Sequence, residues 1–295
     1  MRYLRVRYSY EIPYFARFRI SIYKQRGALS MAIRIVPFDI PSLELLRVPP
    51  VMKDVALSNK GPVLVTGVTG SGKSTTLASM IDYINNNKKC HIITIEDPIE
   101  YVHQDKMALV NQREIGTDTR TFASAFRAAL RQDPDIILVG ELRDSETMEI
   151  ALRAADTGHL VLSTVHATDT LETIGRFIDA FPPEQHRQVR IQLAANLNAI
   201  ISQRLIKTSD DSGRVLAAEI MMLNAAIREH IPAPEKAKSI LKNMEQGREQ
   251  YGSQTFDQAL FDLYSANIID FDEAVKNATS PNDFKLKVNL GGKKE

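Results

Sequence analysis

The chain has 295 residues, of which 44% are apolar and 25% charged, and its net charge is +1. These proportions are those of a soluble globular protein, and the length allows one large domain or a domain with a smaller companion. The single cysteine excludes a disulfide framework and a cysteine-rich zinc site. The near-zero net charge creates no strong electrostatic field that would attract nucleic acid. No apolar run approaches the ~20 residues of a membrane span.

Apolar and polar side chains alternate in the first 36 residues, which is the period of half-buried strands. The loop between the runs 16–23 and 29–36 contains a glycine and suits a hairpin turn. A hairpin centred near Arg26 places Arg19 almost opposite Arg34 on the polar face. Because like charges repel across a strand pair, these two arginines need water or an anion beside them.

Four prolines between residues 36 and 50 break the strand pattern, so we place a domain boundary near residue 38. Beyond it, helical stretches alternate with four near-continuous apolar runs, PVLVTG, HIITIED, DIILVGE and HLVLSTVHA. This alternation predicts a mainly parallel sheet covered by helices on both faces. After PPEQHRQ we expect a long helix that continues to about Leu205, and we expect the last sixty residues to be helical.

The segment GVTGSGKST, residues 67–75, matches the phosphate-binding pattern G-x-x-x-x-G-K-[ST]. It follows a strand-like run and opens a helical one, so its N–H groups can cradle phosphates. Lys73 is expected to reach the β- and γ-phosphates of ATP, and Ser74 to bind Mg²⁺. The alternative is a glycine-rich turn that merely starts a helix. The residues expected to bind nucleotide here are Gly67, Thr69, Gly70, Ser71, Gly72, Lys73, Ser74 and Thr75.

Acidic residues follow the next two strand-like runs. Glu96, Asp97 and Glu100 lie at the end of one run and in the loop after it. ATP hydrolysis needs a carboxylate that orients water, and strand ends in open α/β sheets line the ligand crevice. A solvated acidic loop is an equally good interpretation of this spacing. The other run ends in Gly140 and Glu141, where most enzymes with a phosphate-binding loop have an aspartate near the magnesium ion.

Two histidines, His159 and His166, begin and follow the run HLVLSTV. Their separation of seven residues is odd, so on one strand they would face opposite ways. His166 lies toward the carboxyl end, where it could sense a γ-phosphate. For His159 a structural role is the more common alternative.

Six segments occur in a characteristic order: GVTGSGKSTT, TIEDPIEYVH, NQREIG, DPDIILVGELRD, GHLVLSTVHA and AIREHI. Together they resemble the secretion-type ATPases, and most closely the PilT family of type IV pilus retraction motors. The resemblance runs from about Tyr8 to at least Ile231. It implies an α/β fold: a RecA-like ATPase core at 39–231, the remnant of an α+β domain at 1–38 and a helical region at 232–295.

The resemblance also implies roles for the residues in these segments. Glu100 would be the catalytic carboxylate, and Glu141 would support magnesium through water together with Ser74. Glu96 and Asp97 would belong to the same acidic box. His166 would contact the γ-phosphate, and His159 would belong to the same histidine box.

The two N-terminal arginines match a pair that, in this family, reaches nucleotide across a subunit boundary. Arg19 and Arg34 would therefore be catalytic in trans, because an arginine stabilises charge on the transferred phosphoryl group. The alternative is that Arg19 and Arg34 lie on a solvent-exposed face of the sheet and have no catalytic role. The segment AIREHI matches a helix tied to retraction, although its residues alone indicate an ordinary amphipathic helix with Ile227 and Ile231 inward.

The implied activity is Mg²⁺-dependent ATP hydrolysis by a homo-hexamer that withdraws pilin subunits through an inner-membrane platform protein. Such a motor would be cytoplasmic, peripheral to the inner membrane at most, and would bind no nucleic acid. The family's N-terminal domain normally starts some fifty residues earlier, so we expect it to be shortened here. The related assembly motors carry a four-cysteine zinc module, which one cysteine excludes. Alternatives are an accessory or regulatory ring subunit with little turnover, a pilus or type II secretion assembly ATPase, and a nucleic-acid translocase.

Overall fold

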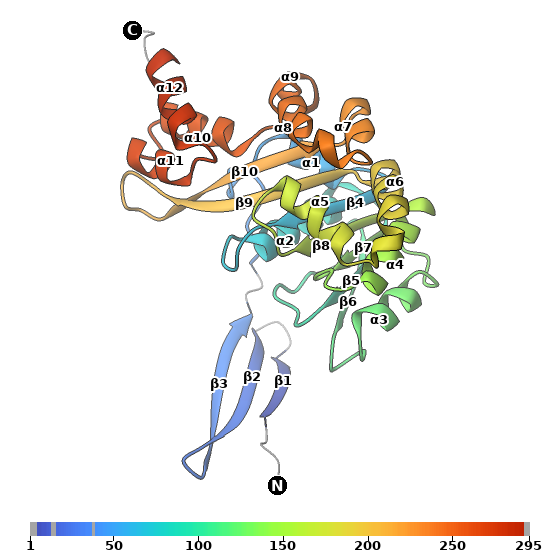
Figure 1. Ribbon diagram of the computed structural model, residues 1–295. Helices are drawn as coiled ribbons and strands as arrows, with labels where there is room; N and C mark the ends of the chain where they lie inside the picture. Colours follow the sequence, from blue (N-terminus) through green and yellow to red (C-terminus); the bar gives the residue numbers. More distant parts are fainter. Residues whose placement is uncertain (1–4, 13–15, 37–38, 292–295) are drawn as a thin grey trace.

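The computed structural model of the chain describes residues 5–12, 16–36 and 39–291. Figure 1 shows a central sheet enclosed by helices, with a small sheet (β1–β3) extending from one side and a group of helices (α10–α12) at the opposite end. None of the helices within these ranges is both long and apolar enough to cross a membrane. The predicted order of an α/β core between N-terminal strands and C-terminal helices is confirmed.

The small N-terminal sheet is antiparallel, and its strand order is β1-β2-β3. Its strands are β1 (Arg5–Ile12), β2 (Ala16–Gln25) and β3 (Ala28–Val36). Arg26 and Gly27 form the turn between β2 and β3 with φ values of 49° and 84°, as a two-residue hairpin turn requires. The pairing sets Arg19 opposite Arg34, so the predicted register is confirmed.

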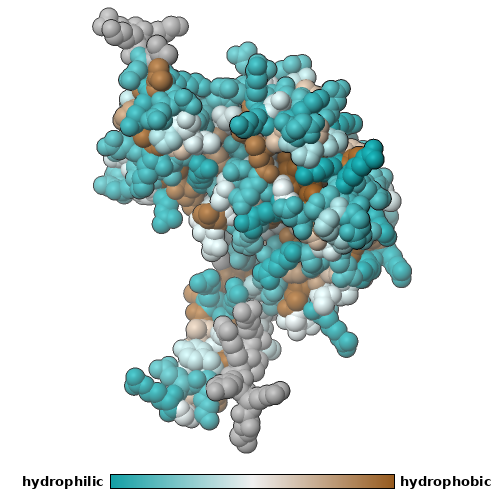
Figure 2. Space-filling model, viewed as in Figure 1, coloured by the Kyte–Doolittle hydropathy of each residue, from teal (hydrophilic) through white to brown (hydrophobic). Residues whose placement is uncertain are grey.

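One expectation for this sheet is not met. The apolar side chains of β3 are not half-buried, because Leu29, Met31, Ile33 and Ile35 are 56–70% exposed. No described part of the chain covers these four side chains. On the face seen in Figure 2, hydrophilic residues predominate, and hydrophobic ones gather in small areas that include the junction of this sheet with the core.

The central sheet has seven strands in the order β10-β9-β4-β8-β7-β5-β6. The strands are β4 (Gly61–Thr66), β5 (His91–Glu96), β6 (Leu109–Glu114), β7 (Ile136–Val139), β8 (Leu160–Val165), β9 (Ala199–Lys207) and β10 (Arg214–Met222). All neighbouring pairs are parallel except β9 and β10. The predicted mainly parallel sheet is therefore confirmed, and the carboxyl ends of six strands meet at one edge.

Helices cover both faces of this sheet, because alternate strand residues enter two separate cores. In β4, Leu64 packs into one core while Val63 and Val65 pack into the other. The helices of the body are α1 (Val51–Ala56), α2 (Lys73–Asn87), α3 (Phe122–Ala129), α4 (Ser145–Asp156), α5 (Thr170–Asp179), the short η1 (Pro183–Gln185) and α6 (His186–Asn196). α1 and α2 contribute to the core of Val63, and α3–α6 to the core of Leu64.

The expected long helix to Leu205 is wrong. α6 ends at Asn196, and β9 begins at Ala199. Leu197 and Ile201 continue the helical spacing of Val189 and Leu193, and periodicity alone does not separate a buried helix from a strand buried on both faces. Ile200 and Ile201 enter opposite cores between β4 and β10. Pairing with β4 therefore decides the conformation here.

The C-terminal region is helical, as predicted. The helices after β10 are α7 (Ala225–His230), which lies within the predicted core, and then η2 (Pro234–Lys236), α8 (Ala237–Gln246), α9 (Arg248–Tyr251), α10 (Phe256–Ser265), α11 (Phe271–Asn277) and α12 (Pro281–Gly291). α7 and α8 bury Ile227, Ile240 and Met244 in the core of the body. The last three helices form a separate core with the far ends of β9 and β10, where Ile206 and Val215 lie.

Candidate nucleotide-binding site

The loop between β4 and α2 requires glycine at three positions. Gly67, Gly70 and Gly72 have φ values of 142°, 82° and 91°, which side chains disfavour. At Gly67 there is also no room, because a Cβ atom would lie 2.5 Å from Ser71 Oγ and 2.6 Å from the backbone oxygen of Gln203. The loop therefore turns tightly into the N-terminus of α2, which is the geometry that binds phosphates.

This loop borders a cavity of about 620 Å³ at the carboxyl edge of the parallel sheet. The cavity brings together most residues that the sequence singled out. Those that line it are Arg34, Thr69, Gly70, Gly72, Lys73, Ser74, Thr75, Glu96, Asp97, Glu100, Glu141 and His166. Gly67 and Ser71 belong to the loop but are not among the lining residues, and Ser71 is buried.

The ammonium group of Lys73 contacts the backbone of its own loop and forms no ion pair with a described carboxylate. Its Nζ donates hydrogen bonds to the backbone oxygens of Gly67 at 2.8 Å and Val68 at 3.0 Å. Burial lowers the pKa of Lys73, against the opposing effect of Glu141 and Glu100. A phosphate group entering the cavity would therefore meet an ammonium group held by weak neutral acceptors, which it can replace.

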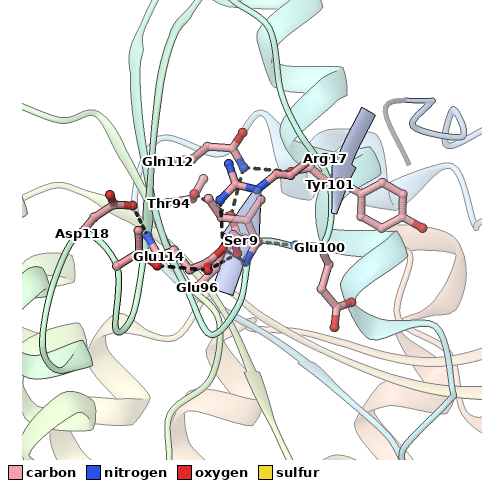
Figure 3. A network of polar contacts seen from close by, with 11 residues as sticks. Ser9, Arg17, Thr94, Glu96, Glu100, Tyr101, Gln112, Glu114 and Asp118 are labelled. Atoms are coloured by element: carbon pink, nitrogen blue, oxygen red, sulfur yellow. Dashed lines mark hydrogen bonds and ion pairs between the residues drawn. The ribbon is translucent and has the colours of Figure 1, made fainter. Parts of the chain in front are cut away.

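The acidic loop after β5 gives its two glutamates different surroundings. Glu96 Oε1 accepts hydrogen bonds from Thr94 Oγ1 at 2.6 Å and Gln112 Nε2 at 3.1 Å, and burial raises its pKa. Its other oxygen accepts a bond from the backbone N–H of Glu100 at 3.4 Å. The Glu100 side chain is exposed, and in Figure 3 it points away from this network. Glu96 thus holds the loop, while Glu100 is free to act in the cavity.

Glu141 follows β7 and meets His166, which follows β8. Glu141 Oε2 lies 3.3 Å from His166 Nε2, and the side chain of Glu141 is 12% exposed. Two bonds between the strand ends hold this pair: Leu142 N–H to Thr164 O at 3.0 Å, and Thr164 Oγ1 to Gly140 O at 2.7 Å. Both residues were predicted from the sequence, and the parallel pairing of β7 with β8 brings them together.

Outside the phosphate-binding loop, two predicted residues do not line the cavity. His159 lies at the amino end of β8, at the opposite edge of the sheet, and its Nδ1 contacts Ala154 O at 2.9 Å and Thr157 Oγ1 at 3.0 Å. Within one chain His159 therefore lies away from this cavity and its side chain contacts its own neighbouring segment, and its role in nucleotide binding stays a prediction. Arg34 lines the cavity of its own chain, whereas Arg19 does not. The contact of both arginines across a subunit boundary stays a prediction.

Several residues of the site were missed. Arg143 forms an ion pair with Glu141 and lines the cavity, and its position two residues after Glu141 was a signal for it. Tyr101 Oη lies 3.0 Å from Thr75 Oγ1, which joins the acidic loop to the phosphate-binding loop. His103 also lines the cavity, and its Nδ1 has no hydrogen-bond partner among the described residues. Tyr101 and His103 lie in the segment TIEDPIEYVH, but neither received a role from the sequence.

A family model described as "Type II/IV secretion system protein" matches residues 46–262, which include the whole central sheet. The chain belongs to this family. A twitching motility protein of Neisseria gonorrhoeae is 47% identical over 266 residues, covering 90% of this chain and 71% of the relative. The type IV pilus retractation ATPase PilT of Pseudomonas aeruginosa is 46% identical over 282 residues, covering 96% of this chain and 81% of the relative.

Two solved structures are similar to the chain over most of its length. A crystal structure of the pilus retraction motor PilT with bound ADP has a TM-score of 0.88 and 46% identity, covering 96% of this chain and 80% of that one. The ATPase DotB of Legionella pneumophila has a TM-score of 0.78 and 28% identity, covering 98% of this chain and 78% of that one. The resemblance drawn from the sequence segments is therefore confirmed.

Replacing Gly67 tests the phosphate-binding loop. Gly67→Ala places a methyl group against Ser71 and the Gln203 backbone, so nucleotide binding is expected to weaken at least about tenfold, or ~1.4 kcal/mol. A titration with ADP measures this. The matched control is Gly175→Ala in α5, where a Cβ meets nothing within 4 Å and helix propensity gains ~1 kcal/mol. Equal affinity in the two variants would contradict the assignment of this loop.

His103 makes stability depend on pH. Burial lowers the pKa of His103 from 6.5 to about 4, so the folded state holds the ring neutral where the unfolded chain binds a proton. The contribution of His103 to the free energy of unfolding should therefore be fully present above pH ~6.5. It should fall by up to about 3 kcal/mol as the pH drops to ~4. Denaturant unfolding at several pH values measures it. His103→Phe should flatten this slope, and an unchanged slope would refute the prediction.

Proposed function

We propose that this chain is a Mg²⁺-dependent ATPase that powers type IV pilus retraction as part of a hexameric ring. The observation that carries the proposal is the convergence of Lys73, Glu100, Glu141 and His166 on one cavity at the sheet edge. The names of two relatives, a twitching motility protein and a pilus retractation ATPase, support the biological role.

ATP would bind with its phosphates on the loop of residues 67–75. The ammonium group of Lys73 would leave its two backbone acceptors for the β- and γ-phosphates. The ADP bound in the solved structure of the pilus retraction motor supports nucleotide binding by this chain. Arg34 lines the same cavity and would add a second positive charge.

Hydrolysis would use the exposed carboxylate of Glu100 as general base on the attacking water. Glu141 is held between Arg143 and His166, so its carboxylate is fixed in orientation. His166 is 54% exposed at the cavity wall, where it would contact the γ-phosphate.

The residues present fit a magnesium ion bound mainly through nucleotide. Ser74 and Glu141 supply hydroxyl and carboxylate oxygens in the same cavity, which is the donor type that Mg²⁺ prefers. The described residues contain no cluster of three or more His, Cys, Asp or Glu that could hold a metal without phosphates. When bound, the ion would neutralise charge on the phosphates.

The ring would act on an inner-membrane platform protein from the cytoplasmic side. A nucleotide between Arg34 of the N-terminal sheet and the loop of the core would couple hydrolysis to the relative position of these two parts. The single cysteine excludes the four-cysteine zinc module of the related assembly motors and favours the retraction branch. α7, with Arg228 exposed and Ile227 buried, would contribute to retraction through its outer face.

The role of Glu100 is tested by Glu100→Gln. The amide keeps the size of the side chain but cannot take a proton, so turnover should fall by ~10²–10⁴-fold while ATP binding is retained. Steady-state phosphate release and nucleotide titration measure the two quantities. Glu149→Gln, which changes an exposed glutamate of α4, is the control and should behave as wild type. Normal turnover in Glu100→Gln would remove the assignment of the base.

The oligomeric mechanism is tested by measuring Mg²⁺-ATP turnover per subunit over a range of protein concentrations. If neighbouring subunits complete each site, turnover should rise with concentration and then level off. Lys73→Ala gives the background rate. Low and constant turnover with intact ATP binding would contradict the motor and favour an accessory ring subunit.

A further inference from the structure

One carboxylate joins the N-terminal sheet to the core. Glu114 stands at the carboxyl end of the edge strand β6, and its Oε2 accepts a hydrogen bond from Arg17 Nη2 of β2 at 3.0 Å. Its Oε1 accepts a hydrogen bond from Ser9 Oγ of β1. Figure 3 shows both side chains of the small sheet reaching this one residue. The network therefore spans two parts of the chain that are about a hundred residues apart in sequence.

The same carboxylate also holds the acidic loop. Glu114 Oε2 accepts the backbone N–H of Ile99 at 3.3 Å, one residue before Glu100. The backbone of Glu114 is fixed, because its N–H donates to Asp118 Oδ2 at 2.8 Å and the residue pairs in register with Glu96 of β5. Any displacement of the Glu114 side chain thus acts directly on the backbone that carries Glu100.

This bridge, the ion pair between Arg17 and Glu114, is buried, so losing either side chain would leave the other without compensation. The side chains of Glu114 and Arg17 are 6% and 16% exposed. A buried carboxylate is stable only when it is paired, and removing one partner leaves the other uncompensated. Neither residue lines the nucleotide cavity, whereas Arg34 of the same sheet does. The docked sheet therefore places Arg34 at the nucleotide cavity and Arg17 on Glu114 at the same time.

We propose that Glu114 is a positioning residue that fixes the loop bearing Glu100 only while Arg17 of the N-terminal sheet is docked on it. Docking of the sheet is thereby coupled to the placement of the general base, in addition to any direct contact of its arginines with nucleotide. This inference rests on the proposed hydrolysis, since Glu100 matters only as the base.

The test replaces Arg17, which does not line the nucleotide cavity. In Arg17→Gln the amide N–H of Ile99 should exchange with deuterium about tenfold faster, because the unpaired carboxylate of Glu114 turns toward water and releases this N–H. The kcat for ATP should fall by about tenfold through misplacement of the base, while the Kd for ATP stays within about twofold. Arg17→Lys restores the charge and should restore both quantities. Arg153→Gln breaks an exposed ion pair on α4 and should change neither.

A further variant separates the bridge from general undocking of the sheet. Arg34→Gln should lower kcat without raising exchange at Ile99, because Arg34 does not contact Glu114. Equal acceleration of exchange in Arg34→Gln and Arg17→Gln would overturn the proposal, as would wild-type exchange and kcat in Arg17→Gln. If the wild-type chain does not hydrolyse ATP, the proposed function fails, but the exchange at Ile99 still decides whether the bridge holds the loop.

Discussion

Parallel pairing of β4, β5, β7 and β8 is the constraint on which the site depends. Because these strands run in the same direction, their carboxyl ends and the loops that follow them share one edge of the sheet. The phosphate-binding loop, the acidic loop, Glu141 and His166 each follow one of these strands. Strands buried on both faces hold this edge rigidly, and hydrogen bonds between Gly140 and Thr164 and between Thr75 and Tyr101 tie neighbouring loops together.

The cavity at this edge is lined by acidic and basic side chains. The three glutamates among them differ in burial and in hydrogen-bond partners. Glu96 is held by Thr94 and Gln112, and burial raises its pKa, so it acts as part of the scaffold. Glu141 is fixed by Arg143 and His166. Glu100 alone among these three glutamates is exposed, which leaves its carboxylate accessible to water. Similar residue types therefore perform different tasks because their solvation and their partners differ.

The N-terminal sheet adds a second constraint. Its polar residues contact the core through Glu114 and the nucleotide cavity through Arg34, while the apolar side chains of β3 remain exposed. Two parts of one chain can move relative to each other unless a large apolar interface joins them. Movement of this sheet would change both the charge facing the nucleotide and the hold on the acidic loop, which is a physical basis for coupling hydrolysis to motion.

The amino-acid sequence by itself determined the phosphate-binding loop, the mainly parallel sheet, the opposition of Arg19 and Arg34 and most residues that line the cavity. These features follow from local signals: glycine spacing, apolar runs and period-two alternation. Only the tertiary structure decided that residues 199–207 form a strand, because the place between β4 and β10 selects it. The same holds for His159, which parallel strands place at the far edge, and for Glu114 and His103, whose importance arises from burial and from partners distant in sequence. Local patterns encode conformation, but contacts between distant segments exist only once the sheet has brought them together.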